Sequence, residues 1–371
     1  MWLASLTVRA FRNLASLDVD LPPEGCVIVG GNGHGKTNLL EAIYYLVLFR
    51  SLRGARDREL VRFGEPGFFL GADRRTGGRT DGNSAPAESP PRRVTAGYEM
   101  AGGRKKVTVD GAETRKLSEA VGQLLAVSFS PADVALVAAG PSARRRYLDV
   151  LLSVSEQGYL SRLSALRSAL KQRNAALRRG KPEEARAFDG PLAESAARVS
   201  LARHCWAERW QARFSELCRA LGEVTPTSLR HHTQVSPGEG ADGWLKALAY
   251  SQDRDARRGS TTVGPHRDDL RLSLGEHDLG TYGSAGQHRT AAVALRLLEA
   301  ESLRASHGTA PTALYDDVFA ELDGERQERL LELIREVLPG QAMVVAPRDA
   351  EVPGDLLDRP RWRIREGVLE H

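Results

Sequence analysis

The residues whose types and spacing most clearly suggest a chemical function form a glycine-rich run near the start of the chain. Residues 30–37 read GGNGHGKT and match the pattern G-x-x-x-x-G-K-[ST]. Glycines in such a loop let successive backbone N–H groups point at phosphate oxygens, and the N-terminus of the following helix adds partial positive charge. We expect Lys36 to neutralise the β- and γ-phosphates and the Thr37 hydroxyl to bind Mg²⁺. The run therefore predicts a nucleoside triphosphate site; the alternative is a chance glycine-rich turn.

Two adjacent aspartates far along the chain could complete this site. Asp316 and Asp317 directly follow the apolar segment Ala313–Tyr315. We expect Asp316 to hold Mg²⁺ through its water shell. Asp317 is placed to orient or deprotonate the attacking water, and it is the predicted catalytic residue together with Lys36. The alternative is a polar loop after a core strand. Asp316 lies 280 residues beyond Lys36, which indicates a nucleotide-binding head whose halves lie at opposite ends of the sequence.

A third run with anion-binding character lies between these two motifs. It consists of Ser284, Ala285, Gly286 and Gln287, and it leads into a predicted helix. Small residues, a hydroxyl and open N–H groups at a helix start can bind an anion. Alternatively, Ser284 is an ordinary N-cap. Because the three motifs occur in the order P-loop, serine loop and double aspartate, the serine loop is interpreted as a signature loop of the ATP-binding-cassette kind.

The elements that must position these motifs follow from the hydrophobic pattern. The apolar run 26–29 predicts a buried strand before the P-loop, and residues 36–49 predict an apolar helix after it. Residues 289–303 and 325–337 predict further helices, and residues 313–315 and 342–346 predict strands. The fold class is therefore α/β, with an inserted helical lobe between the two halves of the head.

The middle of the chain has a different pattern. Residues 71–93 are rich in Gly, Pro, Ser and charge and are interpreted as a mobile loop, whereas residues 94–100 and 105–109 predict a hairpin. Helical periodicity over 142–179 and 192–221, broken by Gly180 and Pro182, predicts an antiparallel arm. We expect residues 1–130 to be the N-terminal part of the ATPase lobe, 131–260 the helical insertion and 261–371 the C-terminal part.

Composition excludes several classes of protein. The chain has 52 Lys and Arg against 48 Asp and Glu, so the net charge of +4 is only weak evidence for a nucleic-acid partner. The three cysteines have no ligand spacing, which argues against a disulfide framework or a zinc site and fits a reducing compartment. The longest strongly apolar stretch, residues 39–49, is shorter than the ~20 residues of a membrane span. We expect a cytoplasmic protein without a membrane partner.

The motifs and their order resemble the RecF family of bacterial recombination-mediator ATPases, which are related to SMC heads. The resemblance covers almost the whole chain and is carried by residues 30–43, 56–64, 129–149, 263–270, 282–290 and 316–323. The segments GPHRDDL and GPSARRRYLD are more specific than the P-loop. His34, Ala285 and His288 depart from the family, which tends to have glutamine at these positions.

The resemblance implies an ABC-type, SMC-like head with ATP and Mg²⁺ as cofactors. Two heads of an ATP-dependent homodimer would close over two ATP molecules, with the P-loop of one facing the signature loop of the other. The closed dimer would bind DNA at gaps or single-strand/double-strand junctions, act with mediators of the RecR/RecO kind and support recombinase loading. The predicted ATP-binding residues are Gly30, Gly31, Asn32, Gly33, His34, Gly35, Lys36, Thr37 and Asn38.

Two basic clusters are candidates for DNA contacts. Arg144, Arg145 and Arg146 begin the predicted helical region, and residues 104–106 mark the hairpin as Arg104, Lys105 and Lys106. The alternative is a solvated face or local ion pairs, including carboxylate pairs that stabilise the arm.

Three functions remain open from the sequence. The leading prediction is a DNA-repair protein whose weak, DNA-stimulated ATPase releases a closed dimer, with DNA binding as its main role. The second is another SMC or ABC-type head, for chromosome maintenance or coupled to a transporter. The third is a metabolic phosphotransferase, for which the sequence shows no small-molecule pocket.

Overall fold

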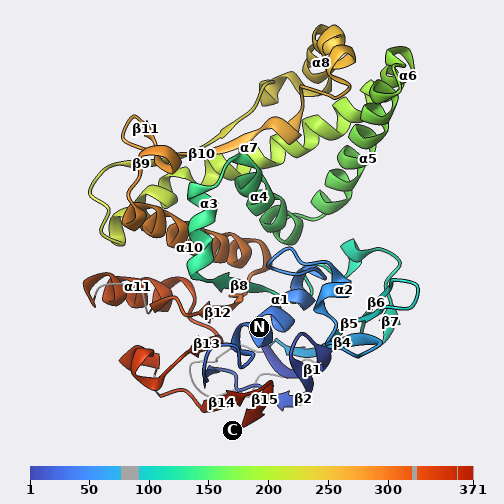
Figure 1. Cartoon of the computed structure of the whole chain (residues 1–371). Helices are drawn as coiled ribbons and strands as arrows, with labels where there is room; N and C mark the ends of the chain where they lie inside the picture. Colours follow the sequence, from blue (N-terminus) through green and yellow to red (C-terminus); the bar gives the residue numbers. More distant parts are fainter. Residues whose placement is uncertain (77–91, 320–323, 357, 371) are drawn as a thin grey trace. The chain divides into compact units, whose positions relative to one another are not determined.

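The chain divides into two compact units, which are described separately. The computed structural model describes residues 1–76, 92–319, 324–356 and 358–370 (Figure 1). Unit 1 comprises residues 1–133 and 296–371, and unit 2 comprises residues 134–295. The first boundary lies close to the predicted one at 130/131, but the second falls inside α10 (Ala285–His307) and not at 260/261. The signature loop therefore belongs to unit 2, contrary to the prediction that it lies in the ATPase lobe.

Unit 1 contains two six-stranded sheets. The first has the order β2-β1-β4-β5-β6-β7 and is antiparallel throughout. Apolar side chains such as Val8, Leu70 and Val107 alternate with polar ones along its strands, which is the pattern of a sheet with one buried face. Its strands are β1 (Trp2–Phe11), β2 (Leu14–Asp20), β4 (Gly67–Arg75), β5 (Arg92–Glu99), β6 (Arg104–Val109) and β7 (Ala112–Glu113).

The second sheet carries the nucleotide motifs and has the order β15-β14-β3-β13-β12-β8. All its neighbours are parallel except β14 and β15, which form a hairpin. The central strands are continuous apolar runs because both faces of a parallel sheet are covered. The strands are β3 (Gly25–Val29), β8 (Ala126–Phe129), β12 (Thr312–Asp316), β13 (Ala342–Ala346), β14 (Arg361–Arg365) and β15 (Val368–Glu370).

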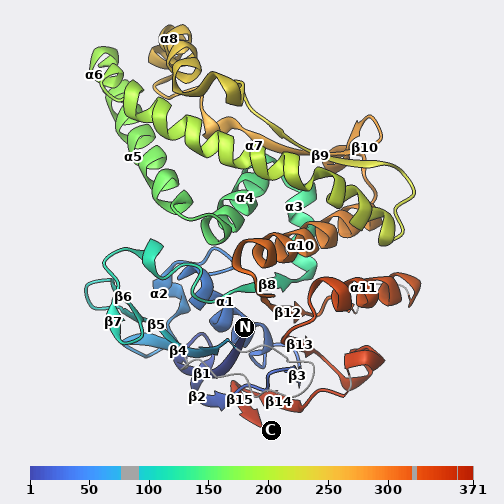
Figure 2. The same ribbon diagram turned by 180° about the vertical axis from the view of Figure 1, so that it is seen from behind.

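Helix α1 (Lys36–Leu48) packs against strands of both sheets. Eleven of its 13 residues are buried, including Glu41, so the helix is enclosed on nearly all sides. In the view from behind, α1 lies close to β4 of the first sheet and β8 of the second (Figure 2). Unit 1 also contains α2 (Asp57–Leu60), α11 (Gly324–Val337) and the second half of α10. The first residue of α1 is thereby fixed at the carboxyl end of β3, as the sequence predicted.

Both ends of the segment interpreted as a mobile loop belong to strands, contrary to the prediction. Residues 71–75 belong to β4 and residues 92–93 to β5, and the two strands pair in register with Asp73 opposite Arg93. These two side chains form an ion pair, with 3.0 Å between Arg93 Nη1 and Asp73 Oδ2. Charged residues in this stretch are therefore compatible with a strand, because they pair across neighbouring strands. Residues 77–91 of the predicted loop lie outside the described part of the chain, as do residues 320–323 of the DDVFAELD motif.

Unit 2 is mainly helical. A three-stranded antiparallel sheet of order β11-β10-β9 accompanies the helices. The elements are α3 (Ala135–Ala138), α4 (Pro141–Ser155), α5 (Tyr159–Arg178), α6 (Pro182–Arg186), α7 (Asp189–Ala220), β9 (Thr227–His232), α8 (Gly240–Arg258), β10 (Asp269–Leu274), β11 (His277–Asp278) and α9 (Leu279–Tyr282).

The arm of unit 2 is formed by α5 and α7, which pack side by side, with α6 in the short connection between them (Figure 1). The helix predicted over 142–179 is two helices, because Gly158 adopts a left-handed conformation with φ 81° between α4 and α5. Across the described residues, none of the helices combines the length and apolar character that crossing a membrane requires.

Candidate functional site

The P-loop lies between β3 and α1, where the sequence predicted it. Gly33 and Gly35 have φ values of 80° and 110°, which only glycine adopts without strain. Gly35 is the N-cap of α1 and supplies no side-chain cap. The N–H groups of the first helical turn therefore have no side-chain acceptor at the cap. These N–H groups, together with the partial positive charge of the helix N-terminus, can bind an anion.

Lys36 folds back over this loop. Its side chain is buried, and Nζ donates hydrogen bonds to the carbonyl oxygens of Gly30 at 2.6 Å and Gly31 at 3.1 Å. These bonds hold the ammonium group against the loop that would wrap the phosphates. An ammonium group in this position could neutralise phosphate charge, and that role of Lys36 stays a prediction.

Thr37 and Asp316 meet although they are 279 residues apart. The Thr37 hydroxyl donates to Asp316 Oδ1 at 2.9 Å, because the parallel pairing of β3, β13 and β12 brings the strand ends to one edge of the sheet. Burial raises the pKa of Asp316, the Thr37 hydrogen bond partly offsets this effect, and the negative charge of Asp317 adds to it.

This pair fits a magnesium ion. A hydroxyl and a carboxylate are hard oxygen ligands of the kind Mg²⁺ uses, and Mg²⁺ normally takes one or two protein ligands and completes its shell with phosphate and water. Burial and the charge of Asp317 raise the pKa of Asp316, and a bound cation would stabilise its charged form. Thr37 and Asp316 are therefore the residues that would hold the ion.

Asp317 is held in an unusual backbone conformation. Its φ is 54°, which is uncommon for a non-glycine residue, and its N–H donates to the Val345 carbonyl at 3.3 Å. Its Oδ1 is buried and has no hydrogen-bond partner among the described residues. Burial raises the pKa of Asp317, and the nearby charge of Lys36 lowers it in part. A strained, unpartnered carboxylate with a raised pKa has the properties of a general base.

Asn13 supports the P-loop and was missed by sequence reasoning. Asn13 donates through Nδ2 to the Gly33 carbonyl at 3.2 Å and accepts from Asn38 Nδ2 at 2.8 Å. A side chain on Gly35 would collide with Asn13, since its Cβ would lie 2.9 Å from Asn13 Oδ1. Asn13 therefore fixes the loop from one side.

The hairpin formed by β14 and β15 fixes the loop from the other side. His34 Nδ1 accepts from the Glu366 N–H at 3.1 Å, and the His34 carbonyl accepts from the Gly367 N–H at 2.9 Å. The residues Glu366-Gly367 are a turn signal from which the sequence could have predicted a hairpin. The contact of this turn with His34 could not have been predicted in the same way. His34, which departs from the family, is therefore an anchor of the loop.

A buried charge on α1 was also missed. Glu41 is 1% exposed and accepts from Arg12 Nε at 3.0 Å and Ser51 Oγ at 2.5 Å. The hydroxyl and guanidinium satisfy the carboxylate that the apolar helix would otherwise bury unpaired. This cluster fixes the segment after α1 and the β1–β2 turn against the P-loop helix.

The signature-loop residues come together at the start of α10 in unit 2. The Ser284 N–H donates to Gln287 Oε1 at 2.9 Å, and the Ser284 hydroxyl accepts from the Gln287 N–H at 3.3 Å. This reciprocal capping is the ordinary N-cap arrangement considered as the alternative. Ser284 and Ala285 are exposed and Gly286 is partly exposed, so the helix start also remains accessible to an anion.

The arginine triplet on α4 divides into three environments. Arg144 is 7% exposed and makes a bidentate pair with Asp269, with Nε–Oδ1 at 2.8 Å and Nη2–Oδ2 at 2.9 Å. Its Nη1 also donates to the carbonyls of Val137 and Ala139. These contacts contradict the prediction that Arg144 faces DNA, because its donors are engaged inside unit 2. They are the carboxylate pair considered as the alternative.

The other basic candidates also differ. Arg145 Nη1 donates to the Asp268 carbonyl at 2.7 Å, whereas Arg146 is exposed and has no partner among the described residues. Lys105 is turned inward to Asp57 Oδ2 at 2.7 Å, which contradicts a role in DNA contact for this side chain. Lys106 pairs loosely with Glu113 at 3.5 Å, and Arg104 is exposed.

The fold and the site together define a P-loop ATPase head of the SMC-like, ABC type. The family model described as the RecF/RecN/SMC N-terminal domain matches residues 2–353. A solved SMC head bound to the C-terminal winged-helix domain of ScpA superposes with a TM-score of 0.54 at 16% identity, covering 100% of this chain and 97% of that one, which supports the fold alone.

Closer similarity is found to RecF proteins. The DNA replication and repair protein RecF of Halalkalibacterium halodurans is 36% identical over 347 residues, covering 90% of each chain. The recombination mediator protein RecF of the RecFOR pathway, solved with ATP, has a TM-score of 0.87 at 30% identity, covering 100% of this chain and 97% of that one. The chain belongs to the RecF family.

Proposed function

We propose that this protein is an ATP-dependent DNA-binding protein of recombinational repair and replication restart. The observation that carries the proposal is the junction of Thr37, Asp316 and the unpartnered Asp317 beside Lys36, in a chain of the RecF family. The related RecF structure solved with ATP supports ATP as the nucleotide. The protein acts in the cytoplasm and does not require a membrane.

Each residue of the site has a distinct part in this proposal. The P-loop N–H groups and Lys36 bind the triphosphate, while Thr37 and Asp316 hold Mg²⁺, which balances phosphate charge. Asp317 accepts a proton from the attacking water. Because aspartate is shorter than glutamate and reaches the attacking water less readily, hydrolysis is slow. ATP binding rather than turnover thus sets the state of the protein.

Dimer closure links the two units in this proposal. In this model of the dimer, a second copy supplies the signature loop of its unit 2 to the ATP bound at the P-loop of unit 1. The accessible start of α10 at Ser284 would contact the γ-phosphate of the partner's nucleotide. The closed dimer binds DNA at gaps or junctions and supports recombinase loading with RecR- and RecO-like mediators; hydrolysis releases it.

The test is sedimentation of the protein with ATP, with a non-hydrolysable analogue and without nucleotide, each with and without a gapped duplex. ATP is expected to produce a dimer that DNA stabilises, and DNA is expected to stimulate the slow ATPase. A head that dimerises with ATP but neither binds DNA nor responds to it would instead support the second candidate, another SMC or ABC-type head.

A further inference from the structure

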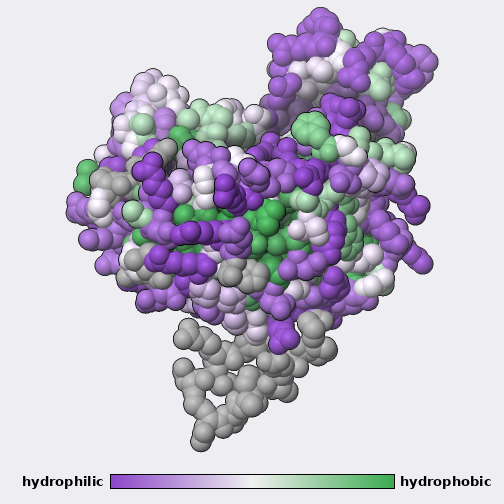
Figure 3. Space-filling model, turned by 60° about the horizontal axis from the view of Figure 1, so that its bottom comes forward, coloured by the Kyte–Doolittle hydropathy of each residue, from purple (hydrophilic) through white to green (hydrophobic). Residues whose placement is uncertain are grey.

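The end of the arm in unit 2 concentrates positive charge. Residues 171–190 and 246–260, which form the end of α5, α6, the start of α7 and most of α8, contain ten Lys and Arg against five Asp and Glu. Their net charge of +5 exceeds the +4 of the whole chain, so the remaining residues are nearly neutral. In the space-filling view the projection that carries α6 and α8 is mostly purple, hence hydrophilic (Figure 3).

Three arginines at the ends of α5 and α8 have no counter-charge among the described residues. Arg178 ends α5, and Arg257 and Arg258 end α8; all three are exposed, and none has a hydrogen bond or ion pair within the described part of the chain. By contrast, Arg179 and Lys181 pair with Glu184, and Arg186 pairs with Glu183. Four of the five acids of this region, Glu183, Glu184, Asp189 and Asp255, are therefore already paired with other cations.

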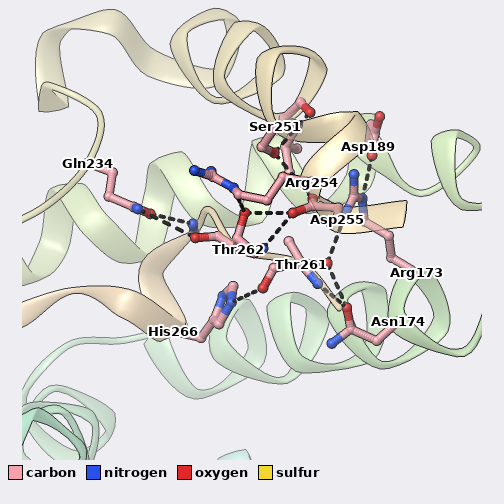
Figure 4. Close-up of polar contacts among 12 residues, drawn as sticks. Arg173, Asn174, Asp189, Gln234, Ser251, Arg254, Asp255, Thr261, Thr262 and His266 are labelled. Atoms are coloured by element: carbon pink, nitrogen blue, oxygen red, sulfur yellow. Dashed lines mark hydrogen bonds and ion pairs between the residues drawn. The ribbon is translucent and has the colours of Figure 1, made fainter. Parts of the chain in front are cut away.

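The two helix ends that carry these arginines are held together by a buried network (Figure 4). Arg173 of α5 donates through Nη1 to Asp255 Oδ2 of α8 and to Thr261 Oγ1, both at 2.8 Å, and through Nε to Asp189 Oδ1 of α7 at 2.7 Å. Asp255 in turn accepts from the N–H and hydroxyl of Thr262 at 2.9 and 2.6 Å. The network fixes α8 on the arm.

Next to this network the arginines lie close to one another. A Cβ on Gly259, the residue directly after Arg258, would lie 3.6 Å from Arg178 Cγ, so the end of α8 touches the end of α5. Like charges at adjoining helix ends repel, and none of the described carboxylates forms an ion pair with Arg178, Arg257 or Arg258 to offset this cost. Both helix C-termini favour cations locally, which offsets part of this cost but neutralises no guanidinium group.

Helix α8 extends the basic surface along one face. Lys246, Tyr250, Arg254 and Arg257 recur at steps of four, four and three residues, which places them in one stripe. All four are exposed, and Tyr250 is 92% exposed. Basic side chains around an exposed aromatic ring are typical of surfaces that bind nucleic acid, with contacts to phosphates and stacking on bases.

We propose that the end of the arm, comprising Arg178, Arg257, Arg258 and the α8 stripe, is a DNA-backbone contact site distinct from the α4 and hairpin clusters. This inference rests on the proposed DNA-binding function and names residues that carry it. The three guanidinium groups engage phosphates, whereas Tyr250 contacts an unpaired base next to them. Rigid attachment of α8 through Arg173 makes the ends of α5 and α8 one surface.

The test compares two triple variants of the full-length protein with ATP and a labelled gapped duplex. The arm-end variant is Arg178→Gln, Arg257→Gln and Arg258→Gln. The control is Arg219→Gln, Arg230→Gln and Arg271→Gln, which removes equal charge from exposed positions elsewhere in unit 2. ATP affinity and thermal stability should be unchanged in both, because exposed side chains are replaced.

Loss of three phosphate contacts should reduce the magnitude of the slope of log K (K being the association constant for DNA) against log salt concentration by about 2.7, at about 0.9 per contact. If both plots converge at 1 M salt, this corresponds to about 150-fold weaker binding at 0.15 M salt. Tyr250→Ala should weaken binding to the gapped duplex about tenfold and leave a blunt duplex unaffected. The control should keep the wild-type slope to within about one.

Three outcomes would overturn the inference. The arm-end variant could keep the wild-type slope, or the control could lose as much, which would indicate unspecific charge. Alternatively, wild-type protein and the arm-end variant could bind DNA equally, while an acidic polypeptide such as poly-glutamate binds only the wild-type protein. This result would assign the surface to a protein partner. If wild-type protein with ATP binds no DNA at all, the proposed function fails and not only this site.

Discussion

The bidentate pair between Arg144 and Asp269 leads to the most discriminating stability prediction. Both side chains are largely buried, at 9% and 14% exposure. Arg144→Ala removes two charge-assisted hydrogen bonds to the carboxylate and two further bonds to the carbonyls of Val137 and Ala139. The variant therefore leaves Asp269 as an unpaired charge in a nearly dry site.

Removing one partner of a buried ion pair costs about 3–5 kcal/mol. For a unit the size of unit 2, each kcal/mol lowers the melting temperature by about 2–4 °C, so we expect a decrease of about 6–20 °C. Arg146→Ala is the matched control, because Arg146 lies on the same helix, is exposed and has no partner among the described residues. Its free energy of unfolding should change by less than about 0.5 kcal/mol.

Differential scanning calorimetry of the two variants and of Arg144→Ala/Asp269→Ala measures these differences. The double variant should recover part of the loss, because it removes the unpaired carboxylate as well. DNA binding at matched folded fraction should not change with Arg144→Ala. If Arg144→Ala and Arg146→Ala melt within about 2 °C of each other, the structural role assigned to Arg144 is refuted.

Further predictions concern the nucleotide site. Lys36→Ala should abolish ATP-induced dimerisation without unfolding the protein, and unchanged ATP affinity in a filter-binding assay would argue against the P-loop assignment. Asp317→Asn should bind ATP and remain dimeric but lose turnover. In wild type, turnover should fall on acidification, because Asp317 must be deprotonated to act as a base. The fall should occur at a pH above the pKa of an ordinary aspartate, because burial raises the pKa of Asp317. Residual turnover of the Asn variant with the same fall at low pH would contradict this role. Ser284→Arg should bind ATP normally yet stay monomeric by light scattering; a dimer would remove Ser284 from the shared interface.

Local motifs allowed the sequence to predict the chemistry of the site but not its supports. The P-loop and the double aspartate are each defined by a strand end and a few adjacent residues, so their positions on β3, α1 and β12 follow from local patterns. The contacts of His34 with Glu366 and of Asn13 with Gly33 join distant segments. No local pattern in a single sequence specifies such pairs.

Helical periodicity distinguishes the three arginines of α4 from one another. Arg144, Tyr147, Leu148 and Leu151 are spaced i, i+3, i+4 and i+7, so helical periodicity places Arg144 on the apolar face of α4 and its neighbour Arg146 away from it. Consecutive positions on a helix point in different directions, and three adjacent arginines cannot share one DNA-facing surface. The identity of the partner, Asp269, could be learned only from the fold, since it lies 125 residues away.

The charge of Asp316 leads to a final prediction about the metal ion. Asp316 is a partly buried carboxylate whose pKa is raised by burial and by Asp317, so the nucleotide-free site already contains negative charge that Thr37 and nearby cations offset only in part. A triphosphate adds more. Without Mg²⁺, Asp316 should repel the nucleotide; with Mg²⁺, the same carboxylate should help to hold the ion with Thr37.

Asp316→Asn should therefore change ATP affinity in opposite directions under the two conditions. In EDTA the variant should bind ATP more tightly than wild type, by about 3- to 10-fold for the removal of one partly screened charge at an effective dielectric constant of about 20. In Mg²⁺ it should bind more weakly, because a ligand of the ion is lost. Asp20→Asn, an exposed carboxylate at the end of β2, is the control and should change neither affinity. Isothermal titration calorimetry under both conditions measures the crossover. Weaker binding in EDTA as well would show that Asp316 supports the fold of the loop and does not act through its charge.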